Sequence, residues 1–553
     1  MSAPATATST SPDAERSSRR RRRLALVIMS LGVSLIVVDA TIVNVLIPQM
    51  VDGLGLTTDD AQWVTSSYPM VFAALLIPLG RAGDLVGRRR MFLLGVAVFM
   101  AASLLAAAAP GGTSLVAARA LQGVGASMIM PATLSTVNAM FTGRERAVAF
   151  GIWGSLIGGM AALGPLLGGA IATSLSWRWA FGINLPLGLA LIAGALAFMP
   201  ETRQPQVRGV DWAGGALAML GMGALVCGII EGPWYGWWTP LRPFGLGPFD
   251  WPLGGLSPVP VALFLGVVLL AALAVVERAR SAAGRPVMLD PALLRIASFR
   301  QGNLTAGLVS VGELGLLFVL PLFLVGVHGD SPLQISVAIL PLAVGAFLAG
   351  PFAGRLAARR GAHQVVRLGL ALEVVAVLAI GLTLTATTGG WGLAPWMLTY
   401  GVGLGLASAQ LTSVCLADVP PAHAGQASGT QSTSRQLGAA LGIALIGTVF
   451  ATGLGRQMAD RLERTALPAD RQAAVVHELR KSAGTYARDL HRTPGARIEA
   501  QAAGESLAAA TRDAMLATSA VLTLGLAMSL RLRPDGAPHR EESDPMTTHE
   551  IGA

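Results

Sequence analysis

Long apolar runs alternate with short polar segments along almost the whole chain of 553 residues. A helix needs about 20 residues to cross a ~30 Å hydrocarbon layer, and fourteen runs come close to or exceed that length. The pattern therefore predicts an all-α polytopic membrane protein in which the lipid bilayer is a partner. The predicted spans are 24–48, 61–83, 91–110, 114–136, 147–171, 178–199, 210–231, 259–277, 302–326, 333–357, 365–386, 393–414, 430–451 and 506–530.

Arginines concentrate in alternate loops. They follow the second, fourth, sixth, eighth and tenth spans, whereas the segment 49–60 instead holds three aspartates. Because loops rich in Lys and Arg stay in the cytoplasm, both termini are predicted to be cytoplasmic. The segments 1–23 and 532–553 are expected to be disordered tails. The loop 452–505 is predicted to lie outside, where its Ala, Arg and Glu content favours amphipathic helix.

Composition narrows the classes of protein that fit. The chain is 53% hydrophobic and 13% charged, whereas a soluble protein carries roughly a quarter charged residues. The net charge of +9 follows from the loop arginines and does not predict nucleic-acid binding. Cys227 and Cys415 lie in apolar spans and the seven histidines are scattered, so neither a metal site nor a cofactor is expected. Arginine instead of lysine at nearly every basic position suggests a high-GC bacterium.

An internal repeat organises the spans. The segments 80–90 and 354–361 both begin with Gly-Arg and carry a second glycine seven residues later. Glycines 123 and 125 of the fourth span likewise match glycines 401, 403 and 405 of the twelfth. Both offsets are eight helices, which predicts two six-helix bundles, 24–200 and 301–531, with two inserted helices in 201–300. Parallel six-helix repeats around a midplane site are an architecture of secondary transporters.

Arg119 is the most conspicuous charge inside a predicted span. A guanidinium stays protonated and is costly to bury in hydrocarbon without a partner. Asp39 lies roughly 14 Å and Arg119 roughly 8 Å below the outer ends of their helices, so the two side chains are predicted to meet. We expect Asp39 to carry a proton and Arg119 to be its electrostatic partner. A static structural pair, or an Arg119 that snorkels to the surface, is the alternative.

Further polar residues inside the spans are candidates for a substrate cavity. Glu313, between nearby glycines, and Glu373 lie roughly 20 Å and 12 Å from the inner ends of their helices, where a carboxylate suits a cationic substrate or a second proton. Instead of lining a cavity, these acids could pair with a neighbouring helix. Hydrogen bonding between helices is equally the alternative for the uncharged candidates. The uncharged candidates are Asn44, Tyr68, Gln122 and Gln410.

Six segments together resemble known sequence motifs: 39–48, 80–90 (motif A), 119–126 (motif B), 164–169 (motif C), 177–186 and 435–438. The chain thus resembles the major facilitator superfamily, specifically its fourteen-helix drug:proton antiporters, over essentially every span. The resemblance implies two six-helix bundles plus two inserted helices. It also implies a secondary transporter, not an enzyme, which works by alternating access.

The resemblance also assigns roles to glycines and charges. Motif A comprises Gly80, Gly83, Asp84, Gly87 and Arg88. In it, Gly83 and Gly87 would permit a tight turn, Asp84 would face a helix N-terminus and Arg88 to Arg90 would lie near anionic lipid headgroups, so that the motif latches one conformation from the cytoplasmic side. The arginines also form a charge cluster that sets the topology.

In motif C, Gly164 and Pro165 would kink a helix, and Gly168 and Gly169 would allow close packing. Two positions depart from the family pattern. Met160 stands where motif C usually has glycine, and Ala358 replaces the aspartate in the second copy of motif A.

The favoured interpretation is a proton-driven exporter of hydrophobic or cationic small molecules in the cytoplasmic membrane, expected to act as a monomer. No Gly-rich loop followed by Lys and Ser or Thr is present, so the sequence gives no sign of ATP binding. A dedicated exporter of one endogenous metabolite or antibiotic, or a proton-coupled uptake carrier, is the alternative. A membrane enzyme or sensor would need a catalytic cluster in the loops or a folded output domain, and is disfavoured.

Overall fold

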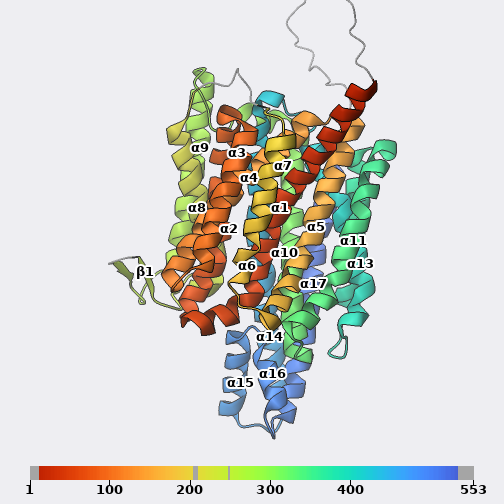
Figure 1. Cartoon of the computed structure of the whole chain (residues 1–553). Helices are drawn as coiled ribbons and strands as arrows, with labels where there is room; N and C mark the ends of the chain where they lie inside the picture. The colour runs from red at the N-terminus through yellow and green to blue at the C-terminus, as the bar shows by residue number, and fades with distance from the viewer. Residues whose placement is uncertain (1–11, 203–208, 247–248, 533–553) are drawn as a thin grey trace, which may run out of the picture.

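The computed structural model describes residues 12–202, 209–246 and 249–532, and almost all of them are helical (Figure 1). The helices of the first half are α1 (Pro12–Leu54), α2 (Thr58–Val86), α3 (Arg88–Ala107), α4 (Gly112–Met140), α5 (Gly143–Ser174), α6 (Trp179–Gly182) and α7 (Asn184–Phe198). Two helices follow, α8 (Trp212–Tyr235) and α9 (Pro258–Ala282). They flank a hairpin of β1 (Phe244–Leu246) and β2 (Phe249–Trp251), paired antiparallel.

The second half contains a 3₁₀ turn η1 (Pro291–Arg295), α10 (Ala297–Phe323), a π-helical turn η2 (Leu324–His328), α11 (Pro332–Arg360), α12 (Ala362–Thr383), α13 (Gly390–Cys415), a 3₁₀ turn η3 (Pro421–His423), α14 (Ala424–Leu462), α15 (Ala469–Lys481), α16 (Tyr486–Arg492) and α17 (Arg497–Ser529). Within the described residues, twelve helical segments are long and apolar enough to cross a membrane. The other two predicted spans, 393–414 and 506–530, coincide with α13 and α17, which are long helices but not among the twelve.

Several helices are longer than the apolar pattern predicts. The helix α1 begins at Pro12, so residues 12–23 are helical and the expectation of a disordered segment 1–23 is wrong for that part. Adding residues to an existing helix costs little, and arginine is a good helix former. Residues 1–11, and 533–553 of the predicted C-terminal tail, lie outside the described residues. The predicted turn 49–60 shrinks because α1 continues to Leu54 and α2 begins at Thr58.

The two halves meet along two seams. The helix α2 packs against α14, and α5 packs against α11 and α13. The pair α8–α9 contacts both α2 and α14 through α8, at one side of the bundle (Figure 1). The inserted helices therefore lie beside a seam between the halves.

Glycine backbones bring the halves unusually close at these seams. A Cβ on Gly80 would stand 2.6 Å from the carbonyl oxygen of Gly425, and one on Gly151 would stand 2.7 Å from that of Gly350. Both separations are shorter than any side chain allows, so these positions require glycine. The pattern repeats in the two seams, as expected from the internal repeat: α2 meets α14 as α5 meets α11.

The predicted outer loop 452–505 is a helical layer. The helix α14 continues to Leu462, α15 and α16 follow, and α17 begins at Arg497. Figure 1 shows this layer projecting beyond the bundle, at the end away from the start of α1. Leu454, Met458, Leu479 and Leu490 are buried in it and belong to the same apolar core as α10 and α12. The layer is thus packed onto the C-terminal half.

Candidate functional site

Asp39 and Arg119 form a buried ion pair between α1 and α4. The Arg119 Nη1 atom lies 2.5 Å from Asp39 Oδ2, and both side chains are almost fully buried. The Arg119 Nε atom also donates to the backbone oxygen of Val64, 3.3 Å away on α2. The sequence predicts this pairing from depth alone, and the structure brings the two residues together.

Two amides and a hydroxyl complete the surroundings of the pair. Gln122 Nε2 and Asn184 Nδ2 both donate to Asp39 Oδ1, at 3.0 Å and 2.7 Å. The same two amides donate to Ser103 Oγ, at 2.9 Å and 3.1 Å. Gln122 Oε1 in turn accepts from Arg119 Nη1 at 2.7 Å. A carboxylate that accepts from three donors has its buried charge well compensated.

Tyr68 covers the guanidinium from the side of α2. Its ring centroid lies 4.5 Å from Arg119 Cζ, which is a cation–π arrangement. Its hydroxyl donates to the backbone oxygen of Ile36 at 3.3 Å. We call Asp39 and the five residues around it the Asp39 network; its members are Asp39, Tyr68, Ser103, Arg119, Gln122 and Asn184.

Sequence reasoning missed Ser103 and Asn184 as members of this network. The segment 177–186, which contains Asn184, is one of the motifs that carry the resemblance, so a signal was present. The structure shows how this segment places Asn184: the helix is interrupted between α6 and α7, and Asn184 is the first residue of α7. Ser103 on α3 carried no comparable signal, because serines are frequent on helices that pack closely.

A second ionic cluster lies in the other half. Glu313 on α10 accepts from Arg435 Nη2 on α14 at 3.1 Å and from Ser408 Oγ on α13 at 2.9 Å. Glu313 is 5% exposed, and the Arg435 side chain is 22% exposed. Arg435 opens the motif 435–438, so the resemblance had marked its segment without giving it a role. This pair is less enclosed than the Asp39 network.

Glu373 on α12 lies near that cluster but outside its hydrogen bonds. The residue is fully buried, and neither carboxyl oxygen has a hydrogen-bond partner in the part of the chain that the structure describes. The hydroxyl of Tyr400 on α13 is likewise buried without a partner there. Glu373 interacts electrostatically with Glu313 and Arg435. We call Glu313, Glu373, Tyr400, Ser408 and Arg435 the Glu313 cluster.

Motif A joins the two halves at the end of the bundle where α2 ends. Asp84 accepts from the backbone N–H groups of Gly425 and Gln426, at 3.0 Å and 3.3 Å, in the first turn of α14. Carboxylates are stabilised at a helix N-terminus. Asp84 also pairs with Arg88 at 2.9 Å. The predicted contact of Asp84 with a helix N-terminus is present, and that helix belongs to the other half.

Two details of the motif A prediction are wrong. Arg88 is fully buried, so it does not lie at lipid headgroups. Besides Asp84, it donates to the backbone oxygen of Pro421 at 3.1 Å, across the seam. Gly83 lies within α2, and only Gly87, with φ of 119°, makes the turn to α3. Arg88 is drawn inward because its guanidinium bonds to Asp84, to the backbone oxygen of Pro421 just before α14 and to the backbone oxygen of Ser135 on α4.

Motif C positions α5 between the halves. Gly164 and Gly168 face α1, where a Cβ on Gly168 would meet Val45 and Ile42 at 3.0–3.3 Å. Gly169 instead faces Leu333 of α11, at 3.3 Å. Pro165 lies inside the continuous helix α5. The motif therefore packs one helix against both halves at once.

Most uncharged cavity candidates have protein partners in this conformation. Tyr68 and Gln122 belong to the Asp39 network, and Gln410 is buried and donates to the backbone oxygen of Ala147 on α5 at 2.9 Å. That bond crosses the seam between the halves. Asn44 is exposed on α1. In this conformation Gln122 and Gln410 thus form hydrogen bonds between helices, which is the alternative to lining a substrate cavity.

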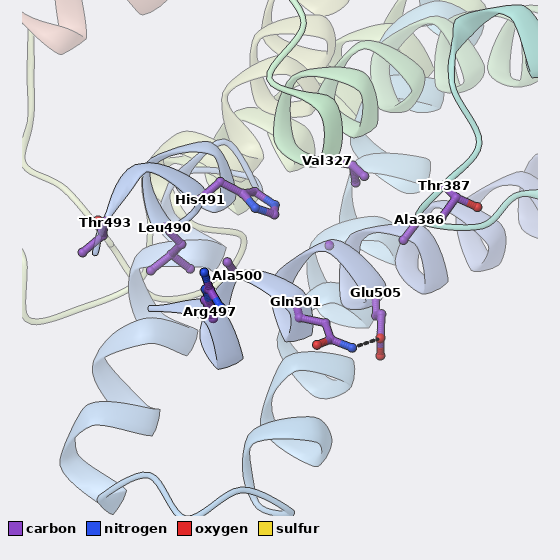
Figure 2. Close-up of a pocket in the computed structure, with 11 residues that line it drawn as sticks. Val327, Ala386, Thr387, Leu490, His491, Thr493, Arg497, Ala500, Gln501 and Glu505 are labelled. Atoms are coloured by element: carbon purple, nitrogen blue, oxygen red, sulfur yellow. Dashed lines mark hydrogen bonds between the residues drawn. The ribbon is translucent and has the colours of Figure 1, made fainter. Parts of the chain in front are cut away.

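Two of the cavities among the described residues lie outside the networks described above. One, of about 430 Å³, lies where the helical layer of residues 452–505 meets loops between α10 and α13, and His491, Arg497 and Glu505 are among its lining residues (Figure 2). The other, of about 530 Å³, lies between α1, α2 and Trp234 of α8. Neither is lined by any of the six predicted cavity residues.

Twelve long apolar helices among the described residues, with buried ionic networks between them, are typical of a polytopic membrane protein. The family model of the Major Facilitator Superfamily matches residues 29–443, so the chain belongs to that superfamily. The human organic anion transporter MFSD10 shares the fold, with a TM-score of 0.57 and 16% identity over 92% of this chain and 99% of that one.

Curated relatives add names of individual transporters. The chain is 32% identical to the probable actinorhodin transporter of Streptomyces coelicolor, over 91% of this chain and 90% of that protein. It is 34% identical to the puromycin resistance protein pur8 of Streptomyces alboniger, over 77% and 81%. It is 31% identical to the multidrug resistance protein Stp of Mycobacterium tuberculosis, over 81% and 80%. The chain is thus a multi-pass membrane transporter with relatives in high-GC bacteria.

Proposed function

We propose that this protein exports amphipathic, often cationic small molecules in exchange for protons. Its relatives carry names of antibiotic and multidrug resistance or transport proteins. We further propose that it belongs to the fourteen-helix subfamily, in which α13 and α17 complete the C-terminal six-helix bundle and both termini are cytoplasmic. The arginine-rich ends of α1 and α3 support this orientation.

The observation that carries the proton coupling is the Asp39 network. Asp39 and Arg119 come from different helices, and a third helix supplies Asn184. A proton on Asp39 would neutralise the carboxylate and weaken its bonds to Arg119, so the packing of α1 against α4 and α7 would depend on protonation. In the conformation described here, Asp39 accepts from Arg119, Gln122 and Asn184, so the pairing between α1, α4 and α7 is intact.

The contacts of motif A support closure of the bundle at one end in this conformation. Asp84 and Arg88 bind the start of α14, and Arg146 Nη1 donates to the backbone oxygen of Ala417 at the same end. If this end is cytoplasmic, the structure represents a state closed toward the cytoplasm. Substrate would enter when these bonds break and would leave from the opposite side.

The test is transport into inverted membrane vesicles that hold a pH gradient, with ethidium as the probe. Wild type should accumulate ethidium, and a protonophore should abolish this. Asp39→Asn should reduce the pH-driven accumulation at least 10-fold at equal amounts of monodisperse protein. The matched control is Asp52→Asn, an exposed aspartate on the same helix α1, which should transport like wild type. Full pH-driven transport by Asp39→Asn, or transport that ignores the protonophore, would refute the proposal.

A second candidate function is export of one endogenous antibiotic. The alignment with the probable actinorhodin transporter covers most of both chains, more than the alignments with the resistance proteins cover. A deletion strain distinguishes the candidates: sensitivity to many compounds supports multidrug export, and accumulation of or sensitivity to a single compound supports a dedicated exporter.

A further inference from the structure

Glu373 lies fully buried where α12 packs against α13. The helix α13 gives it room at Gly403, where a Cβ would stand 2.9 Å from Glu373 Cγ. The side chain is thus enclosed by backbone on that side and is fully buried. Neither oxygen accepts a hydrogen bond from any described residue. An isolated buried carboxylate is far too costly to persist, and such a group takes up a proton instead.

The charges around Glu373 favour the same state. Arg435, on α14, is the cation that acts on it, and this guanidinium is already bonded to Glu313 of α10. The negative charge of Glu313 opposes a second ionised carboxylate nearby. From α13 the titratable neighbour is the Tyr400 hydroxyl. No charged group of α11 or α17, the other helices packed on α12, acts on Glu373 within the described residues.

We propose that Glu373 is a second proton-binding site, protonated in this conformation, and that Arg435 controls its proton. When Arg435 remains on Glu313, Glu373 keeps its O–H bond. When a cationic group takes the place of Arg435 at Glu313, the guanidinium is free to pair with Glu373. The O–H bond of Glu373 then breaks, its proton passes to water, and its carboxylate pairs with Arg435. A substrate cation and a proton thereby exclude each other through one arginine.

This proposal rests on proton-driven export for its role in transport, but its first test needs neither substrate nor gradient. Infrared spectroscopy of purified protein, compared in H₂O and D₂O, detects the C=O stretch of a protonated carboxyl group. We expect Glu373→Gln to remove one such band from the wild-type spectrum. Asp39→Asn should leave the band unchanged, because Asp39 is paired with Arg119 and does not contact Glu373.

A second variant tests the control by Arg435 without touching Glu373. Glu313→Gln frees Arg435 from its carboxylate partner, so Glu373 should ionise and the same band should disappear. Ser408→Ala, which removes only a hydroxyl from Glu313, should retain the band. If Glu373→Gln and wild type have identical bands in monodisperse protein, the proposal is wrong. A band that persists in Glu313→Gln would overturn the role of Arg435.

Transport then tests the stoichiometry. Exchange of one ethidium cation for two protons moves net charge, so a membrane potential should drive wild-type transport. Glu373→Gln should exchange one proton and lose at least 5-fold of the potential-driven rate, while pH-driven transport persists. Potential-driven transport unchanged in Glu373→Gln would refute the second site. The proposed function fails by a different result, namely unchanged pH-driven transport in Asp39→Asn.

Discussion

The two halves of this protein each bury acidic residues, but they treat their charges in opposite ways. In the N-terminal half, Asp39 accepts from Arg119, Gln122 and Asn184. In the C-terminal half, Glu313 pairs with the partly exposed Arg435, and Glu373 has no hydrogen-bond partner among the described residues. The N-terminal half therefore buries the ion pair of Asp39 and Arg119, whereas the C-terminal half buries Glu373 as the proposed neutral acid.

The difference shows that internal repeats need not carry equivalent chemistry. The two halves repeat the glycines of their fourth and twelfth spans and the glycine seams between α2 and α14 and between α5 and α11. Packing is thus preserved by the repeat, whereas charge is not. Ala358 in the position equivalent to Asp84 shows the same asymmetry in the two copies of motif A.

The largest difference between the halves should appear in stability. Asp39→Asn leaves Arg119 buried without a carboxylate, and breaking a buried pair costs about 3–5 kcal/mol. We therefore expect a strong decrease in the unfolding temperature of the detergent-solubilised protein. Glu373→Gln replaces one neutral group by another of similar shape, which should change stability by less than about 1 kcal/mol.

The control for this comparison is the double variant Asp39→Asn/Arg119→Gln, which removes both charges. It should recover most of the lost stability but none of the proton-driven transport. Equal destabilisation by Asp39→Asn and Glu373→Gln would show that the two acids are buried in the same charge state, contrary to the comparison.

An intermediate effect is expected at motif A, where the asymmetry between its two copies can be tested directly. Asp84→Asn removes the charge that binds the start of α14 and leaves Arg88 without its carboxylate. Hydrogen bonds to charged groups contribute about 1.5–3 kcal/mol each, so the open population at this end should rise by roughly 10- to 100-fold.

Spin labels would measure this opening. Cysteines replacing Val86 and Pro420, both exposed on opposite sides of the seam, report the separation of the halves after Cys227 and Cys415 are changed to alanine. The second copy of motif A has Ala358 at the position of Asp84. The variant Ala358→Asp serves as the comparison and should not have the effect of Asp84→Asn. An unchanged distance distribution in Asp84→Asn would contradict the latch.

The smallest effect should come from Ser408→Ala in the Glu313 cluster. It removes one hydroxyl donor from Glu313 while the bond from Arg435 remains. A single hydrogen bond contributes about 1 kcal/mol, so the apparent KM for ethidium should change by about 5-fold, with kcat retained. A loss of kcat instead would place Ser408 in the conformational change, and a null result would place the cation elsewhere.

The sequence predicted the helices and one ion pair well because both depend on simple quantities. Apolar length determines a span, and depth in neighbouring helices brought Asp39 toward Arg119. The burial of Arg88 was not predictable in this way, because its partner Pro421 is 333 residues away along the chain. Gln410 likewise appears able to line a cavity until the seam with Ala147 is known. Polar side chains in spans are easy to find, but their partners follow from packing.

The glycine seams have a consequence for the speed of the conformational cycle. Where Gly80 meets Gly425 and Gly151 meets Gly350, backbone touches backbone and no interlocked side chains have to change rotamer for the halves to separate. The activation barrier at these contacts should then depend mainly on the few polar bonds that cross the seam. Evolution could therefore adjust turnover through single polar residues at the seam, without altering the residues that select the cargo.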